Sequence, residues 1–268
     1  MTGVDEAQGR AGDRAYWSRI GTRERARDRL WRAHSDAVNG RLLKRWLPAQ
    51  RGGRVLKTDL FDEAFGDGLV EVLRDRYATV LGIDISQSVI RAAREGHADH
   101  QWARCDVRSL PFRDAAFQAI ASISTLDHFP RRADVVTALR ELHRVLAPGG
   151  LLILTLDNRA NPIVGMRNLL PFRLVHAMGL VPYYVGHTVG PWRARRLLVE
   201  AGFDLVDTET VMHCPRVLAV PLSRLLERRA GGASQARFLR FLLAFERLRG
   251  WPTAPWTGHF VALMAIRR

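Results

Sequence analysis

Asp84 is the first residue whose type and position indicate a chemical role. It closes the apolar run VLGID and lies about 20 residues beyond an acidic turn that contains Gly66 and Gly68. A carboxylate at the end of the second strand of a βαβ unit can accept hydrogen bonds from both ribose hydroxyls of a nucleotide-like cofactor. The spacing therefore predicts a site for an adenosine group.

A strand, turn, helix, strand unit over residues 54–86 would position this carboxylate. The segment begins with an apolar run, passes through the acidic turn, continues with helical apolar spacing and ends in a second apolar run. This change of period is what a βαβ crossover requires. Because ligands bind outside the carboxyl ends of parallel strands, near the first βα turn, the turn and Asp84 are expected to share one site.

Apolar runs and helical patterns continue to alternate after Asp84. Ser86 is placed to cap a helix, and the run at 117–124 is apolar enough for a central strand that is buried on both faces. Further strands are expected at 102–106, 151–157, 204–212 and 259–267, and further helices at 133–146 and 192–201. The alternation predicts an α/β fold with a doubly wound, mostly parallel sheet.

The composition bounds the organisation of the chain. With 268 residues, of which 47% are apolar, it can form one large domain with insertions. Residues 1–50 are expected to form a disordered tail followed by a helical lid, and residues 51–268 to form the α/β domain. The insertions would lie at about 162–190 and 215–257, where the alternation of strands and helices is interrupted.

The N-terminus and the cysteine content favour a cytoplasmic protein. The polar N-terminus has no apolar segment long enough for a signal peptide or a membrane span. The two cysteines, Cys105 and Cys214, can form at most one disulfide and show no metal-ligand spacing. A reducing compartment and a chain without a metal site are therefore the expectation.

The net charge of +14 is unevenly distributed. Residues 1–50 contain 11 basic and 6 acidic side chains, residues 51–160 contain 15 of each, and residues 161–268 contain 15 and 6. Basic flanks can bind RNA, an anionic lipid surface or an acidic substrate. A GC-rich genome would produce the same excess, because Lys44 and Lys57 are the only lysines and all other basic residues are arginines. Both interpretations stay open.

Three stretches follow one another along the chain, namely VLGIDIS, CDVRSLPF and ELHRVLAPGGLLILTLDN. In their order and approximate spacing they resemble the class I S-adenosylmethionine-dependent methyltransferases, of the broad group that includes small-molecule and quinone-pathway enzymes. The resemblance covers residues 50–160 well and 190–268 more loosely. It implies a Rossmann-like sheet of seven strands, S-adenosylmethionine as the cofactor, and an enzyme that transfers methyl groups.

The resemblance also implies roles for individual residues. Asp84 would hold the ribose hydroxyls, and Ile85 would contact adenine. Asp106 would accept a hydrogen bond from the adenine amino group, with the backbone of Val107 alongside. Because a charged carboxylate makes stronger hydrogen bonds than a neutral acceptor, loss of Asp84 should strongly weaken cofactor binding.

The first motif departs from the family pattern. The family has an acidic residue followed by closely spaced glycines, which let the backbone approach the methionine part of the cofactor. The matching stretch is LKTDLFDEAFGDG, in which larger residues from Asp59 onward replace small ones, and the candidate glycines Gly66 and Gly68 come later. Either a longer turn brings Asp59, Asp62 or Glu63 to the ammonium group of the cofactor, or the pocket binds the cofactor poorly or not at all.

His128 is the candidate general base. Methyl transfer needs in-line placement of the acceptor, which can lower the barrier by about 7–11 kcal/mol, and a base where the pKa of the acceptor is high. Asp127 and His128 follow the expected central strand, where it should open into the cavity, so Asp127 would orient the imidazole. A structural role for His128 fits the same position.

The acceptor is expected to be a small molecule. Base-modifying amino-methyltransferases resemble one another in an Asn/Asp-Pro-Pro-aromatic element after the fourth strand, whereas this chain has STLDHF. Nucleic acid is therefore the less favoured partner. Specificity should lie in the two insertions, and in the first of them Tyr183, Tyr184 and His187 are candidate acceptor contacts within an apolar roof.

The second insertion contains amphipathic, basic segments, PLSRLLERR and ARFLRFLLAFERLRG. They fit a roof over a lipophilic acceptor, a peripheral contact with a membrane surface, or a helix pair packed on the core. We expect methyl transfer to an O or C atom of a lipophilic or aromatic small molecule, in a biosynthetic pathway. A non-catalytic binding or scaffold protein of the same fold and an RNA-modifying enzyme are the alternatives, and the sequence does not indicate an oligomeric state.

Overall fold

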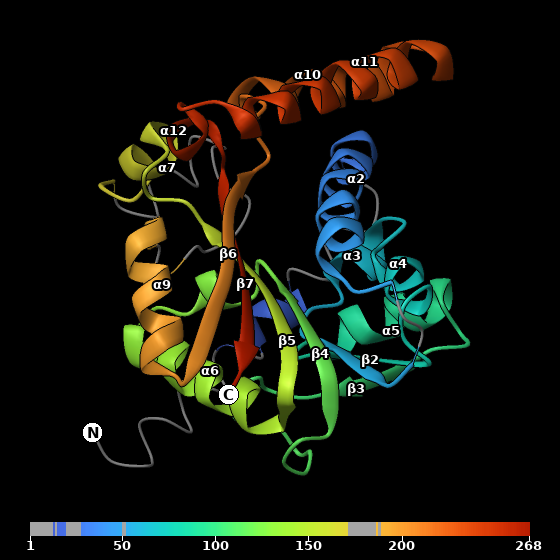
Figure 1. The fold of residues 1–268 in the computed structure, drawn as a ribbon. Coiled ribbons are helices and arrows are strands. Elements are labelled where there is room, and N and C mark those ends of the chain that lie inside the picture. The colour runs from blue at the N-terminus through green and yellow to red at the C-terminus, as the bar shows by residue number, and fades with distance from the viewer. Residues whose placement is uncertain (1–12, 14, 20–27, 50–51, 171–185, 187–188) are drawn as a thin grey trace.

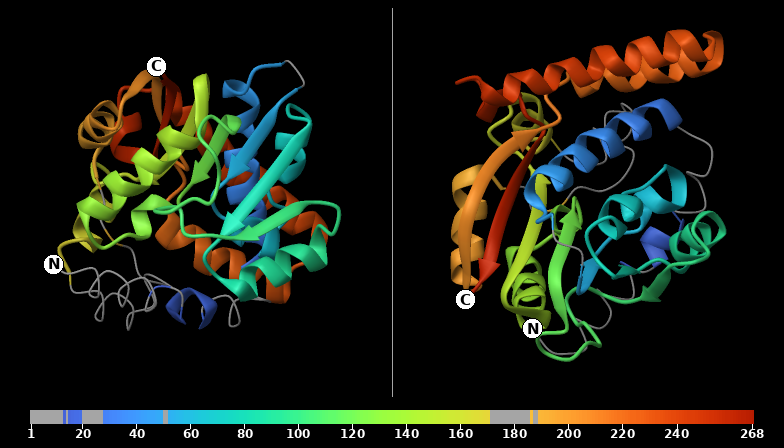
Figure 2. Two further views of the ribbon diagram at one scale, coloured as in Figure 1. Left: turned by 90° about the horizontal axis from the view of Figure 1, so that it is seen from below. Right: turned by 45° about the vertical axis from the view of Figure 1, so that its right-hand side comes forward.

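The computed structural model describes residues 13, 15–19, 28–49, 52–170, 186 and 189–268, which form one seven-stranded sheet with helices on both faces (Figure 1, Figure 2). The strands are β1 (Arg54–Lys57), β2 (Thr79–Asp84), β3 (Gln101–Arg104), β4 (Phe117–Ile123), β5 (Leu146–Asp157), β6 (Phe203–Val211) and β7 (Phe260–Arg267). The predicted α/β fold with a doubly wound, mostly parallel sheet of seven strands is confirmed.

The strands follow the order β3-β2-β1-β4-β5-β7-β6 across the sheet. Neighbouring strands from β3 to β5 are parallel, and β7 is antiparallel to both β5 and β6. The order reverses between β1 and β4. Open α/β sheets bind ligands beyond the carboxyl ends of the strands at such a reversal.

Helices cover the two faces and one end of the sheet. They are α2 (Arg29–Trp46), α3 (Phe61–Phe65), α4 (Val70–Arg74), α5 (Gln87–Gly96), α6 (Arg132–Val145), α7 (Pro162–Arg167), α9 (Pro191–Glu200), α10 (Arg216–Arg229), α11 (Gly232–Ala244) and α12 (Ala254–Thr257), with the 3₁₀ turns η1 (Leu126–His128) and η2 (Phe245–Gly250). One buried core packs α6 and α9 against the sheet, and another packs α2 to α5. The long α10–α11 pair lies across α2, beyond the ends of the parallel strands (Figure 1, Figure 2).

The connection from β1 to β2 differs from the prediction. The acidic stretch expected as a turn forms the short helix α3, and the helical pattern that follows forms the separate helix α4. Gly68, between them, has a φ of 71°, a left-handed conformation that favours glycine. A Cβ atom at this position would also lie 2.9 Å from Cγ of Glu63. Ser86, by contrast, caps α5 as predicted, since its Oγ accepts a hydrogen bond from N of Val89 at 3.3 Å.

The regions predicted as a lid and as insertions contain helices where the structure describes them. The α2 helix lies in the first region, α7 in the first insertion, and α10, α11 and α12 in the second. The division of the chain into a lid and a domain stays a prediction. No helix within the described ranges is long and apolar enough to cross a bilayer. Both Cys105 and Cys214 are free thiols.

Candidate functional site

A cavity of about 790 Å³ lies at the carboxyl ends of the parallel strands and is bordered by α2 and α10. Its volume is in the range of small-molecule sites. Seven of the predicted site residues line it, namely Asp59, Asp84, Ile85, Asp106, Val107, Asp127 and His128. The structure therefore brings the expected cofactor and catalytic positions to one cavity, while the role of each residue stays a prediction.

Gly66 and Gly68 lie apart from this cavity. Neither is among its lining residues. The N–H of Gly68 donates to Oδ2 of Asp36 at 3.2 Å, and the N–H of Gly66 donates to the carbonyl oxygen of Asp62 at 2.8 Å. Both amides are engaged in the chain reversal between α3 and α4, and a cofactor contact at these two glycines stays a prediction.

Leu60 shows how the first motif accommodates a large residue where the family has a small one. Its side chain is fully buried and packs on Gly82 of β2. A Cβ atom at Gly82 would lie 2.4 Å from Cδ2 of Leu60 and 2.4 Å from Cζ3 of Trp102. Asp59 and Phe61 line the cavity, whereas Leu60 does not. The bulky side chain therefore occupies space that Gly82 leaves in the core and does not fill the cavity.

Gly82→Ala is expected to lower the free energy of unfolding by about 1–3 kcal/mol, because the new methyl group would overpack the core around Leu60 and Trp102. Urea denaturation measures this change. Gly232→Ala in α11 is the matched control, since a Cβ atom there meets nothing within 4 Å. The control should be neutral or slightly stabilising, and equal stability of both variants would contradict the tight packing at Gly82.

Lys57 is buried at the end of β1 and is paired with acidic groups. Its Nζ forms an ion pair with Glu63 at 2.7 Å, lies 4.0 Å from Asp62 and donates to the carbonyl oxygen of Asp59. Burial alone would lower the pKa of Lys57, but the charges of the three acidic residues outweigh it and hold the pKa above its ordinary value. Sequence reasoning missed this pair, although a lysine inside an apolar strand, followed by several acidic residues, was an available signal.

The carboxyl groups around Lys57 carry more negative charge than one ammonium group neutralises. Burial is the largest cause of a pKa of about 7 for Asp84 and for Asp62, and of about 6 for Asp59. The charge of Asp59 raises the pKa of Asp84 further, and the charge of Asp36 raises the pKa of Asp62 further. Raised carboxyl pKa values indicate a shortage of positive partners. The sulfonium and ammonium groups of S-adenosylmethionine would supply such partners, so this end of the cavity fits the expected cofactor.

Asp84 and Asp106 are held in fixed orientations by neighbouring groups. The carboxylate of Asp84 accepts hydrogen bonds from N of Leu60 at 3.2 Å and from N of Ser86 at 2.7 Å. The carboxylate of Asp106 accepts bonds from Nε and Nη2 of Arg108 at 3.0 and 2.8 Å. Each carboxylate oxygen has two lone pairs, so Asp84 keeps acceptor capacity for a ligand, whereas bonds from Arg108 engage both oxygens of Asp106 twice.

Asp127 and His128 lie in η1, directly after β4. Ser124, the residue after this strand, adopts a φ of 50° and lines the cavity. Oδ2 of Asp127 accepts a hydrogen bond from Oγ of Ser124 at 3.0 Å, and the ring centroid of His128 lies 4.7 Å from that of Trp17. Burial raises the pKa of Asp127, and the charge of His128 opposes that rise. The prediction that Asp127 orients His128 stays open, because the described bond of this carboxylate is to Ser124.

The opposite end of the cavity combines basic and apolar groups. Arg167 of α7 pairs with Asp157, at the end of β5, at 2.7 Å. The apolar wall comes from both insertions and the segments beside them, and includes Ile163, Met166, Leu170, Met212, Val217, Val220 and Pro221. The predicted acceptor contacts Tyr183, Tyr184 and His187 lie outside the described residues. The first insertion nevertheless reaches the cavity through α7.

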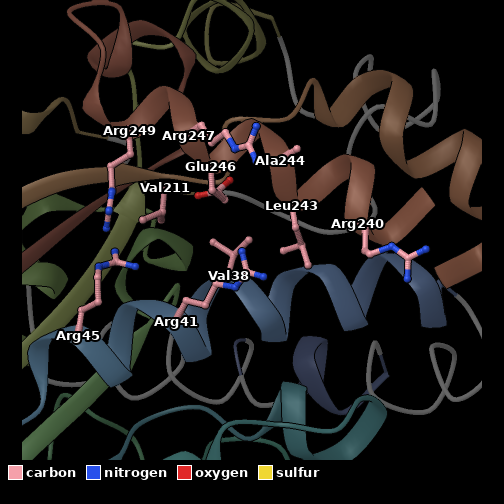
Figure 3. A pocket seen from close by; sticks show the side chains of 10 residues that line it. All are labelled: Val38, Arg41, Arg45, Val211, Arg240, Leu243, Ala244, Glu246, Arg247 and Arg249. Carbon is pink, nitrogen blue, oxygen red and sulfur yellow. The ribbon is translucent and has the colours of Figure 1, made fainter. Parts of the chain in front are cut away.

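A second hollow, the arginine groove, lies between α2 and the α11–η2 segment (Figure 3). It has a volume of about 440 Å³, and its charged lining consists of Glu246 and five arginines, namely Arg41, Arg45, Arg240, Arg247 and Arg249. Arg45 and Arg249 extend toward each other, and both pair with Glu209. The other three form no ion pair within the described part of the chain. The groove therefore carries excess positive charge outside the cavity.

A surface group of Glu71, His97 and His100 places three possible metal-ligand atoms within 4.8 Å of one another. Glu71 is exposed and already lies 3.5 Å from Arg74 and 3.4 Å from His100. Because Arg74 and His100 already provide the carboxylate of Glu71 with partners, no metal ion is needed to explain the cluster, and we assign no function to it.

The sequence matches known proteins over part of its length. A family model described as a methyltransferase domain matches residues 62–154. The probable tRNA methyltransferase 9B of Mus musculus is 39% identical over 74 residues, which is 28% of this chain and 16% of that protein. The malonyl-[acyl-carrier protein] O-methyltransferase of Enterobacter lignolyticus is 29% identical over 142 residues, which is 53% of this chain and 51% of that protein. The chain thus spans about half or less of the length of these relatives.

The fold also matches solved structures. The [4+2]-cyclase SpnF superposes with a TM-score of 0.59 at 20% identity, over 91% of this chain and 83% of that one. At this identity the likeness concerns the fold alone. The methyltransferase-domain match, the curated relatives and the seven-stranded fold agree with one another. Residues 62–154 therefore form a methyltransferase domain, and the relatives and the fold of the chain are those of the class I S-adenosylmethionine-dependent methyltransferases, a family of enzymes whose cofactor is S-adenosylmethionine.

Proposed function

We propose that this chain transfers a methyl group from S-adenosylmethionine to an O or C atom of a lipophilic or aromatic small molecule in a biosynthetic pathway. One observation carries the proposal: a single cavity has an acidic end at Asp59, Asp62 and Asp84 and an apolar end walled by α7 and α10. A cationic cofactor and an apolar acceptor would share this space. Such shared confinement is what in-line transfer between two bound molecules requires.

In this reaction the residues of the chain position the two bound molecules, exclude water and move a proton. S-adenosylmethionine, when bound, supplies an electrophilic methyl group on a sulfonium centre. Trp17 and Trp31 line the cavity from the N-terminal helical region, and a drier cavity strengthens the electrostatic interactions inside it. In this proposal His128, which lines the cavity, takes the proton of an acceptor hydroxyl or C–H group when the new bond to the methyl carbon forms.

Methyl-labelled S-adenosylmethionine, incubated with the chain and an extract of the cells that make it, should transfer label to organic-soluble small molecules. His128→Gln should lower this rate about 100-fold or more, as expected for loss of a general base, without changing the affinity for S-adenosylhomocysteine. Scintillation counting and calorimetry measure the two quantities. His100→Gln, outside the cavity, is the control.

Two results would contradict parts of this assignment. An unchanged rate in the His128→Gln variant would make His128 a structural residue. A folded chain that binds neither S-adenosylmethionine nor S-adenosylhomocysteine would favour the non-catalytic alternative.

RNA methylation is a second candidate, and the arginine groove favours it. Phosphate backbones bind clusters of arginine, and that binding weakens steeply with salt. Label in the RNA fraction of the same extract, together with salt-sensitive tRNA binding that Arg240→Gln weakens, would replace the small-molecule proposal. We rank this candidate second because the stretch STLDHF lacks the Asn/Asp-Pro-Pro-aromatic element of base-modifying amino-methyltransferases.

A further inference from the structure

Four polar side chains meet at the end of the cavity opposite the acidic one. Asp157 comes from the end of β5, Arg167 from α7, Arg216 from the start of α10, and His259 from the residue before β7. Two of these elements belong to the insertions that are expected to determine the acceptor. We call these four residues the basic end of the cavity.

The charges at the basic end do not cancel. Arg167 is paired with Asp157 at 2.7 Å, which leaves Arg216 without a carboxylate partner in the described part of the chain. Burial, reinforced by the charge of Arg216, lowers the pKa of His259 to about 3, so its imidazole is neutral. The 3.5 Å approach of His259 to Asp157 is therefore not an ion pair at neutral pH. Two arginines and one carboxylate leave these four residues with one positive charge, and burial, followed by the charge of Asp157 as a further cause, raises the pKa of the neighbouring carboxyl of Asp127, which disfavours its charged form.

Two donors at the basic end are available to a ligand. Nε of Arg167 is buried and has no hydrogen-bond partner among the described residues, a state that costs free energy unless an acceptor approaches. Arg216 places one guanidinium nitrogen 3.1 Å from Nε2 of His259 and stacks over the ring of Trp31, with 5.5 Å from Cζ to the ring centroid. This stacking orients the guanidinium, which can bind a carboxylate or phosphate with its remaining N–H groups.

The rest of the wall here is apolar. Val217 and Val220 of α10 and Met166 of α7 line the cavity beside Arg216 and Arg167. A ligand that satisfies both kinds of surface has a charged group and an apolar body. The acidic end, at Asp59 and Asp84, would repel the same anion, so the charge pattern also selects one orientation.

We propose that the methyl acceptor is an amphipathic small molecule with an anionic group, a carboxylate or a phosphate, which Arg216 and Arg167 bind at the basic end. The proposal rests on the proposed function, because it names the acceptor of that reaction. It predicts that an anion is preferred over a neutral molecule of the same apolar length.

Decanoate, decyl phosphate and decanol test this preference by calorimetry, with and without saturating S-adenosylhomocysteine. At least one of the two anions should bind about tenfold or more tightly than decanol, as expected for a charge-assisted hydrogen-bonded contact. Arg216→Gln should abolish most of this difference, and Arg216→Lys should retain part of it. Arg228→Gln, on the exposed side of the same helix, should leave it unchanged. Tighter binding of decanoate would indicate an acceptor with a carboxylate, and tighter binding of decyl phosphate would indicate an acceptor with a phosphate.

Two outcomes would overturn the proposal. One is decanol binding as tightly as both anions, and the other is an anion preference that survives in both Arg216→Gln and Arg167→Gln. Unchanged affinity of the variants for S-adenosylhomocysteine shows that they are folded. If the wild-type chain binds the anions through Arg216 but not S-adenosylhomocysteine, the anion site stands and the proposed methyl transfer fails, so the two failures are distinguishable.

Discussion

Asp84→Ala is expected to weaken the binding of S-adenosylmethionine at least about 30-fold, equivalent to about 2 kcal/mol. The carboxylate lies at the end of β2, lines the cavity and is oriented by the N–H groups of Leu60 and Ser86. Its loss would remove two charge-assisted hydrogen bonds to ribose hydroxyls. Calorimetric titration measures the change. Asp75→Ala, exposed beyond α4, is the control and should bind as the wild type does.

The acidic end provides a second readout for Asp84. The pKa values of about 7 for Asp84 and Asp62 and about 6 for Asp59 mean that these groups ionise between about pH 5 and pH 8. A cationic ligand binds the ionised carboxylates better, so wild-type affinity for S-adenosylmethionine should rise over this interval. The rise should be smaller in Asp84→Ala. Wild-type affinity in this variant would contradict the placement of the cofactor at β2.

Lys57→Met is expected to lower the free energy of unfolding by about 3–5 kcal/mol, the usual cost of breaking a buried ion pair by removal of one partner. The side chain of Lys57 is 1% exposed, and its Nζ lies 2.7 Å from the buried carboxylate of Glu63. The variant would leave the carboxylate of Glu63 without its ion-pair partner and would remove the ammonium charge that favours the ionised forms of Asp59 and Asp62. Urea denaturation measures the loss.

The double variant Lys57→Met/Glu63→Gln separates the ion pair from general packing. In the wild type Oε1 of Glu63 accepts a hydrogen bond from the N–H of Leu69 at 2.8 Å. A glutamine at this position keeps a side-chain oxygen for that bond but carries no charge. The double variant should therefore be more stable than Lys57→Met alone, with a coupling energy of about 1–3 kcal/mol. A loss equal to the sum of the two single variants would show that the pair does not act as a unit.

The sheet and the acidic end of the cavity could largely be predicted from local pattern. The period of apolar residues, the capping position of Ser86 and the apolar run before Asp84 all act within a few residues of sequence. Parallel strands end at the same edge of a sheet, so Asp84, Asp106 and His128 had to come close together once the strands were correct. Local pattern could not predict the course of the chain at Gly66 and Gly68, because the direction of a turn depends on contacts such as that of Gly68 with Asp36.

The sequence by itself determined the α/β fold, the family and the carboxylates at the strand ends, because these follow from periodicity and short-range spacing. Only the tertiary structure decided how Leu60 fits against Gly82, how Lys57 is neutralised, and how Arg167 and Arg216 meet at the basic end. Those contacts join residues far apart in the chain or depend on burial. Side-chain packing and the exclusion of water decide them, and neither can be read from a one-dimensional pattern.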